Sequence, residues 1–271
     1  MSKTLDAFKK GKAFIPFITA GDPDADTTVH AVLAMADAGA DLIEIGIPFS
    51  DPTAEGPVIQ QADAIALKNG MNIEGVFDIV ARIRAEKPEL PLAFMTYVNT
   101  VFKYRGNAPK DAKTDPYVPF FARCKEAGID AIILADVPFE EQGEVREVSD
   151  RYDVDLISMV APTSEDRIRE IAKDPRGFIY VVSSMGVTGV RSEFRYDRIS
   201  EMVRIIRETN PSVKCAVGFG ISTPEQAEKM ASLSDGAIVG SAILKKIHAG
   251  AGIPEIAEYV RSMKEAVRRA S

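Results

Sequence analysis

Eight short apolar segments recur along the chain, and longer segments with helical periodicity separate them. The apolar segments cover residues 14–19, 42–46, 91–97, 131–136, 155–160, 177–182, 213–217 and 236–240. Most are apolar at consecutive positions rather than at alternating ones, which is typical of strands buried on both faces of a parallel sheet. The intervening segments keep apolar residues three and four positions apart, as amphipathic helices do.

Eight strand–helix units in succession, without a linker rich in Pro, Gly or Ser, predict an α/β fold with one domain over residues 1–271, a (β/α)8 TIM barrel. A doubly wound open sheet is the alternative, although it usually has fewer strands or a second domain. No G-x-G-x-x-G motif follows the first predicted strand, and this weakens the alternative.

Charge and composition exclude several classes of function. The chain has 33 basic and 40 acidic residues, a net charge of −7, so we expect no nucleic-acid partner. No apolar run approaches the roughly 20 residues that cross a bilayer, and the first residues lack the apolar core of a secretion signal. Cys124 and Cys215 are too few for a disulfide framework. We therefore expect a cytoplasmic protein with no membrane contact.

The small number of histidines limits the chemistry that this chain can carry out. His30 and His248 are the only histidines, and both lie in segments with helical periodicity. We expect neither a metal site nor a Ser-His triad. If the protein is an enzyme, its acid–base groups must be carboxylates, Tyr, Lys or Cys.

Three connections are longer than a minimal barrel requires. Residues 48–56 lead into an extra helix over 57–68, and residues 104–119 form a polar segment that we expect to be a surface loop. Residues 183–194 form the third. All three follow the carboxyl ends of predicted strands, where a barrel builds its active site.

Two carboxylates stand out at the second of the predicted strands. Glu44 interrupts the apolar segment LIEIGIP and should point into the barrel, where burial would raise its pKa and suit it to give and take a proton. The alternative is a structural Glu satisfied by backbone donors or a Lys. Asp51 and Glu55 follow in the loop, where a second carboxylate could stabilise developing positive charge. A turn beside Pro52, and a charge at a helix N-terminus, are the structural alternatives for these two.

Glycine-rich turns follow the last two predicted strands. GFGIST covers 218–223, and GSAI covers 240–243 and opens a helix. Barrels often bind phosphate between these loops, with backbone N–H groups at the start of a short helix. GVTG, at 186–189, could close over the site from the other side.

Several motifs strongly resemble the alpha subunit of tryptophan synthase. They are FIPFITAGDP, LIEIGIPFSDPTAEGPVIQ, ILADVPFEE, GVTGVR, VGFGISTPEQ and GSAILKKI, in the family's order from about Phe14 to the C-terminal helix. The resemblance implies a barrel that cleaves indole-3-glycerol phosphate to indole and glyceraldehyde 3-phosphate without a cofactor. It also implies a partner, a pyridoxal-phosphate-dependent beta subunit that receives the indole in a hetero-oligomer, alpha2beta2.

The resemblance also implies roles for individual residues. Glu44 would be the principal acid–base, and Glu55 falls where the family usually has Asp, the carboxylate that stabilises the indolenine cation. Ser184 is a second departure, at a position where the family more often has Arg. Substrate binding near the two carboxylates would fall to Phe17, Tyr97, Tyr180 and Thr188, whereas Ile133 and Met159 are more simply explained as core. Phosphate binding would fall to Gly189, Gly218, Gly220, Gly240 and Ser241. Contact with the beta subunit would fall to Asp51, Pro52 and Pro138.

Two other functions remain open at this point. One is a different phosphate-binding barrel enzyme, which would normally carry Lys or Asp at the strand ends where this chain has Glu44 and Tyr180. The other is a barrel without catalysis that regulates a beta subunit, and Glu55 is the feature that favours it.

Overall fold

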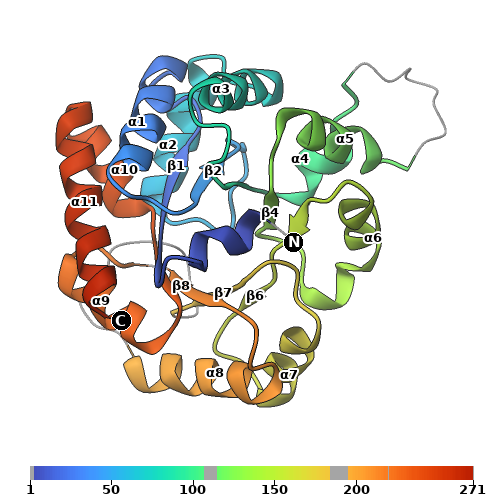
Figure 1. Cartoon of the computed structure of the whole chain (residues 1–271). Coiled ribbons are helices and arrows are strands. Elements are labelled where there is room, and N and C mark those ends of the chain that lie inside the picture. The colour runs from blue at the N-terminus through green and yellow to red at the C-terminus, as the bar shows by residue number, and fades with distance from the viewer. Residues whose placement is uncertain (1–2, 107–114, 184–194, 219, 271) are drawn as a thin grey trace.

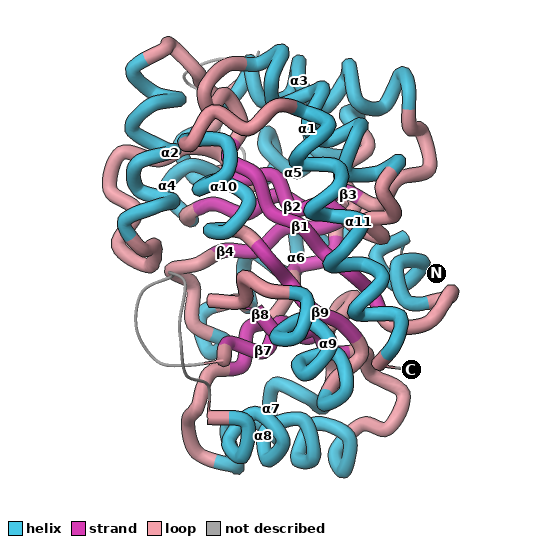
Figure 2. Tube along the Cα trace, turned by 90° about the vertical axis from the view of Figure 1, so that its left-hand side faces the viewer, coloured by secondary structure: helices cyan, strands magenta, loops and turns pink. Residues whose placement is uncertain are grey.

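The strands of this protein form a central ring, and the helices surround it (Figure 1). The computed structural model describes residues 3–106, 115–183, 195–218 and 220–270. Its strands are β1 (Ala13–Thr19), β2 (Ile43–Gly46), β3 (Leu92–Thr96), β4 (Ala131–Leu134), β5 (Asp155–Leu156), β6 (Met159–Val160), β7 (Ile179–Val182), β8 (Cys215–Gly218) and β9 (Gly236–Val239). A side view shows the same layers, with strands inside and helices outside (Figure 2).

The segment 155–160 closes the ring. The sheet runs in the order β5-β4-β3-β2-β1-β9-β8-β7-β6, and all of its paired strands are parallel. Its two ends, β5 and β6, belong to one stretch of chain. Ile157 N–H donates to Ile132 O at 2.9 Å on one side, and Ser158 O accepts from Tyr180 N–H at 3.0 Å on the other. The fifth predicted strand is therefore interrupted rather than missing, and the predicted (β/α)8 barrel is confirmed.

The helices occupy the segments with helical periodicity. They are α1 (Ala25–Asp37), α2 (Pro57–Lys68), α3 (Ile73–Glu86), α4 (Val98–Lys103), α5 (Val118–Ala127), α6 (Gly143–Arg151), α7 (Glu165–Lys173), α8 (Tyr196–Thr209), α9 (Pro224–Leu233), α10 (Ser241–His248) and α11 (Ile253–Arg269), with short 3-10 helices η1 (Lys3–Phe8) and η2 (Phe139–Glu141). The extra helix predicted over 57–68 is α2. Among the described helices, none has both the length and the apolar character that crossing a membrane requires.

Local sequence signals fix where these helices begin and end. The Asp24 side chain accepts from Thr27 N–H at 2.7 Å and starts α1. Thr223 and Gln226 form a reciprocal capping box at the start of α9. Gly128 ends α5 at φ 77°, in the left-handed region where glycine has no steric cost.

Two short elements, η1 and α4, are absent from the sequence-based expectation. η1 lies across the ring of strands at the N-terminal end of the barrel (Figure 1). Phe8 packs on Phe178, with ring centroids 5.6 Å apart, and the Thr4 hydroxyl donates to Asp155. Neither element is long enough to show a helical period, and tertiary contacts rather than local pattern hold them.

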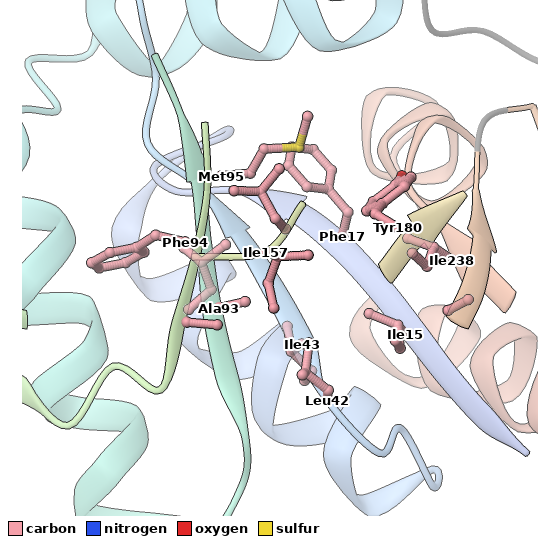
Figure 3. Packing of buried hydrophobic residues seen from close by; sticks show 14 of the residues in the cluster. Ile15, Phe17, Leu42, Ile43, Ala93, Phe94, Met95, Ile157, Tyr180 and Ile238 are labelled. Carbon is pink, nitrogen blue, oxygen red and sulfur yellow. The ribbon is translucent and has the colours of Figure 1, made fainter. Parts of the chain in front are cut away.

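Phe94 tests how much the layer between strands and helices contributes to stability. It is fully buried on β3 and points away from the barrel interior toward the rings of Phe77 and Phe120 (Figure 3). We expect Phe94→Ala to lower the free energy of unfolding by about 3–5 kcal/mol. The matched change Phe102→Ala, on a ring that is 44% exposed, should cost about 1 kcal/mol or less. Denaturant unfolding of both variants measures the difference, and equal costs would contradict this assignment of the core.

Candidate active site

A small cavity lies in the carboxyl-end half of the barrel. It has a volume of about 30 Å³, room for one or two water molecules. Figure 3 shows Phe17, Met95 and Tyr180 at the same end of the barrel interior. The residues that line the cavity come from β1, β2, α2, β3, β7 and β9 and from the turns after β8 and β9: Phe17, Glu44, Ile59, Met95, Tyr180, Gly220, Ile238, Gly240 and Ser241.

Glu44 is the ionisable group of this cavity with the most unusual surroundings. Its side chain is 1% exposed, and among the residues that the structure describes neither carboxylate oxygen has a hydrogen-bond partner. Burial, and then the nearby charge of Glu55, raise the pKa of Glu44 to about 8. At neutral pH the group therefore holds a proton that it can give to a ligand and take back.

Glu55 approaches the same region from the loop between β2 and α2. Its side chain is buried, and its backbone is tied down because Gln60 Nε2 donates to Glu55 O at 2.9 Å. The negative charge of Glu55 contributes to the raised pKa values of Glu44, Tyr97 and Tyr180. The loop thus brings a second carboxylate within electrostatic reach of the first.

Tyr97 supports this loop rather than lining the cavity. Its hydroxyl accepts from Ala54 N–H at 2.9 Å, one residue before Glu55. Its ring stacks on Phe49 with centroids 4.9 Å apart. These two contacts fix the loop at both ends.

Small residues make room for the aromatic rings of the site. A Cβ atom at Gly218 would lie 2.3 Å from Tyr180 Oη, and one at Gly46 would lie 2.7 Å from Phe17 Cζ. Burial first, and then the charges of Glu44 and Glu55, raise the pKa of Tyr180 well above its ordinary value. The phenol therefore keeps its proton and can donate a hydrogen bond.

An anion could bind at the start of α10. Gly240 precedes this helix and Ser241 begins it, and both line the cavity together with Gly220. The first N–H groups of a helix have no partner within it and carry a partial positive charge. Gly220 has φ 86°, a conformation that side chains other than glycine rarely adopt.

Comparison with known proteins decides the family. The family model of the tryptophan synthase alpha chain matches residues 4–269. The tryptophan synthase alpha chain of Lacticaseibacillus casei is 44% identical over 100% of this chain and 98% of its own. That of Caldanaerobacter subterraneus subsp. tengcongensis is 46% identical over 96% of each chain. The chain belongs to the tryptophan synthase alpha chain family.

The fold agrees with the sequence in this assignment. The crystal structure of the tryptophan synthase alpha chain from Legionella pneumophila superposes with a TM-score of 0.84 at 30% identity, over 99% of this chain and 98% of that one. The barrel and its family make the protein a lyase of tryptophan biosynthesis, as the motifs predicted. A different phosphate-binding barrel enzyme is thereby excluded.

The structure brings most of the predicted alpha-chain site together. Glu44, Phe17 and Tyr180 share one cavity with the turn residues Gly220, Gly240 and Ser241, and Gly218 lies directly beneath the Tyr180 ring. The cavity lining does not include Ile133 or Met159. Thr188, Gly189 and Ser184 lie outside the described residues.

The residues predicted to face a beta subunit lie at the surface of the same end of the barrel. Asp51 is exposed and accepts from Ser50 Oγ at 2.6 Å, and Pro52 is half-buried beside it. Pro138 is exposed and begins η2 after β4. Within the part of the chain that the structure describes, no group of three His, Cys, Asp or Glu side chains could hold a metal ion.

Sequence reasoning missed three apolar lining residues and one acid. Ile59, Met95 and Ile238 complete the cavity, and Asp63 is buried on α2. Ile59 and Asp63 are four residues apart in the predicted extra helix, so they share a helix face. That spacing was the available signal.

The buried carboxyl group of Glu44 should lower the free energy of unfolding in a pH-dependent way. Its folded pKa, about 8, lies above the ordinary value of 4.5, so between these limits the folded state keeps a proton that the unfolded state loses. Each pH unit in this window removes up to about 1.4 kcal/mol. We expect Glu44→Gln to be more stable than the parent near pH 8, with the difference shrinking toward pH 5.

Thermal unfolding at both pH values measures this difference. Glu147→Gln, on the exposed face of α6, is the matched control and should show no such pH dependence. A Glu44→Gln variant whose stability relative to the parent is the same at both pH values would contradict a raised pKa.

Proposed function

We propose how the residues of this cavity carry out the alpha reaction of tryptophan synthase, which family membership assigns to this chain. In that reaction a retro-aldol step splits indole-3-glycerol phosphate into indole and glyceraldehyde 3-phosphate. The observation that carries the proposal is Glu44, a buried carboxyl group at the wall of a cavity, whose oxygens have no hydrogen-bond partner within the described part of the chain. The loop of Glu55 and the turns before α10 complete the site.

Glu44 acts as acid and then as base. Protonated at the start, it gives its proton to C3 of the indole ring, which produces an indolenine cation. The bond between C3 and the side-chain carbon then breaks, and its electron pair returns to the ring. The hydroxyl proton of that carbon passes to the Glu44 carboxylate as the aldehyde forms, so the group ends as it began.

Glu55 stabilises the positive charge that develops on the ring nitrogen. A carboxylate near the indole N–H binds the cation more tightly than the neutral ring, which is what lowers a barrier. The Glu side chain is one methylene longer than the Asp that the family usually has here. The contacts of Tyr97 and Gln60 with the loop set where that longer side chain ends.

The phosphate group lies at the start of α10. Backbone N–H groups of Gly240 and Ser241, with the Ser241 hydroxyl, supply the donors, and Gly220 lets the chain approach. Gly218 leaves the space that Tyr180 occupies, and Gly189 contributes to the same phosphate site.

The substrate is much larger than the present cavity. Pockets for small molecules usually measure about 300–1,000 Å³, against about 30 Å³ here. Phe17, Met95 and Tyr180 are among the side chains that line this cavity, so we expect side chains of this lining to move when substrate enters. Tyr180 then packs beside the reacting part of the substrate.

The protein works with a tryptophan synthase beta subunit. Asp51, Pro52 and Pro138 form the docking surface, and indole passes across it to the pyridoxal phosphate of the partner, in an alpha2beta2 hetero-oligomer. The alpha chain needs no cofactor of its own, because proton transfer and charge stabilisation suffice for the step. We place the complex in the cytoplasm, as a single-domain barrel bound to its partner.

Release of glyceraldehyde 3-phosphate from indole-3-glycerol phosphate tests the function. We expect release by the protein alone, a faster rate when a beta subunit is added, and loss of at least about 100-fold in kcat in Glu44→Gln. If the folded protein releases no glyceraldehyde 3-phosphate, either alone or with a beta subunit, the catalytic assignment is wrong. Activation of a beta subunit that persists unchanged in Glu44→Gln would then favour a regulatory barrel.

Paired variants at Glu55 separate its charge from its length. Glu55→Gln keeps the size and removes the charge, and should lower kcat by about 100-fold or more. Glu55→Asp keeps the charge and shortens the reach, so its kcat should fall between those of the Gln variant and the parent. Steady-state kinetics with indole-3-glycerol phosphate gives the order, and a Gln variant as active as the parent would rule out electrostatic stabilisation by Glu55.

A further inference from the structure

The phosphate site proposed above has two arms, the segment 220–223 after β8 and the start of α10. Gly220 lines the cavity from the first arm, and Gly240 and Ser241 line it from the second. The arms belong to different strand–helix units, so an anion between them needs both to be held at a fixed separation. The C-terminal helix α11 packs on α9 and on α10, on the outside of the barrel (Figure 1).

Tyr259 of α11 contacts the first arm through its hydroxyl group. Tyr259 Oη donates to the backbone oxygen of Ser222 at 2.9 Å. Burial raises the pKa of the Tyr259 phenol well above its ordinary value, so the hydroxyl keeps its proton and remains a donor. The bond joins the outer layer of helices to the turn after β8.

Gln226 of α9 also holds Ser222. The side-chain oxygen of Gln226 accepts from Ser222 N–H at 2.8 Å and from Thr223 N–H at 3.2 Å. Ser222 therefore spends both its N–H and its carbonyl group on contacts with α9 and α11. It is an anchor for the first arm rather than a donor to an anion, and Gly220, at the cavity, lies two residues before it.

The ring of Tyr259 contacts the helix of the second arm. Lys246, in the last turn of α10, places its ammonium nitrogen 4.9 Å from the centre of the ring, a distance at which a cation and an aromatic face attract. Glu255 lies one turn before Tyr259 on α11, and its Oε1 is 3.8 Å from the same ammonium nitrogen. One face of α11 thus holds α10, and the Tyr259 side chain touches both units of the phosphate site.

We propose that Tyr259 is a positioning residue that sets the separation of the two phosphate-binding arms. Its hydroxyl fixes the segment 220–223 through Ser222, and its ring supports α10 through Lys246. Tyr259 is not part of the cavity lining, so it acts on a ligand through the two arms. The inference rests on the proposed function, in which these arms bind the phosphate group of the substrate.

Binding of inorganic phosphate to the whole alpha chain tests this role without any reaction. Tyr259→Phe removes the hydroxyl and keeps the ring, and the loss of one hydrogen bond should weaken phosphate binding by about threefold to tenfold. Tyr259→Ala also removes the ring that Lys246 contacts, so it should weaken binding by about tenfold or more. Phosphorus-31 NMR titrations measure the three dissociation constants. Equal affinities in the parent and in Tyr259→Phe would overturn the proposal, as would a parent that binds no phosphate.

Tyr104→Phe is the matched control. Tyr104 Oη also donates a hydrogen bond, to Glu74 Oε1 of α3 at 2.7 Å, between elements that form neither arm. Its loss should leave the dissociation constant of phosphate within about twofold of the parent value. If Tyr104→Phe weakens phosphate binding as much as Tyr259→Phe does, a general loss of packing explains both effects and the positioning role is wrong.

Kinetics with indole-3-glycerol phosphate separates positioning of the arms from a general structural role. In Tyr259→Phe, KM should rise by the same factor as the dissociation constant of phosphate, whereas kcat should stay within about twofold, because the phosphate group is remote from the bond that breaks. Indole has no phosphate group, so its affinity should not change. A variant that lowers kcat at an unchanged KM, or that binds indole more weakly, would contradict the positioning role.

The two proposals fail in distinguishable ways. A parent that binds phosphate but releases no glyceraldehyde 3-phosphate would reject the proposed reaction, and the phosphate titrations of the Tyr259 variants would still decide the positioning role. A parent that releases product, with Tyr259→Phe binding phosphate as tightly as the parent does, would reject the positioning role alone.

Discussion

Closure of the parallel sheet through residues 155–160 is the constraint on which the rest of this structure depends. A parallel sheet with an open edge leaves a row of backbone groups without partners, and a closed one does not. Here one interrupted segment pairs with β4 on one side and β7 on the other. Closure gives every strand an inner face, and it fixes Phe17 beside Glu44 in the register of β1 and β2. The site is thus a product of the ring as a whole.

The site is also where the fold departs from what stability alone would select. A barrel interior is normally filled with branched apolar side chains, and Ile15 and Ile238 follow that rule. Glu44 instead places an acidic group on the inner face of the barrel, and Glu55 and Asp63 are buried on the loop that follows β2 and on α2. The raised pKa values of Glu44 and Asp63 express that cost, and the same cost keeps their protons available at neutral pH. Burial of these carboxyl groups therefore both lowers the stability of the fold and keeps protons available for transfer.

The sequence predicts the elements that have a regular apolar spacing and the charged residues that interrupt an apolar strand, and it predicts little else. The eight strands and the helix α2 follow from apolar spacing, and Glu44 is recognisable because a charge interrupts an apolar strand. The proposed anion site at Ser241 follows from two glycine turns at known positions in a barrel. η1 is held by contacts from Thr4 and Phe8 to residues more than a hundred positions away, which no local pattern encodes. Asp63 shares a helix face with Ile59 in the sequence, but the sequence does not indicate which face of α2 packs against the barrel, and the structure shows that Asp63 is buried.

The small cavity has a consequence for how affinity should be understood in this protein. If the binding-competent arrangement of Phe17, Met95 and Tyr180 is a minor population, the apparent dissociation constant is the intrinsic one divided by that population. Any partner that favours the expanded arrangement then tightens substrate binding without touching the substrate. Linkage is reciprocal, so the substrate must tighten that partner's binding by the same factor. The packing of these three side chains would in this way couple the binding of substrate to the binding of a partner.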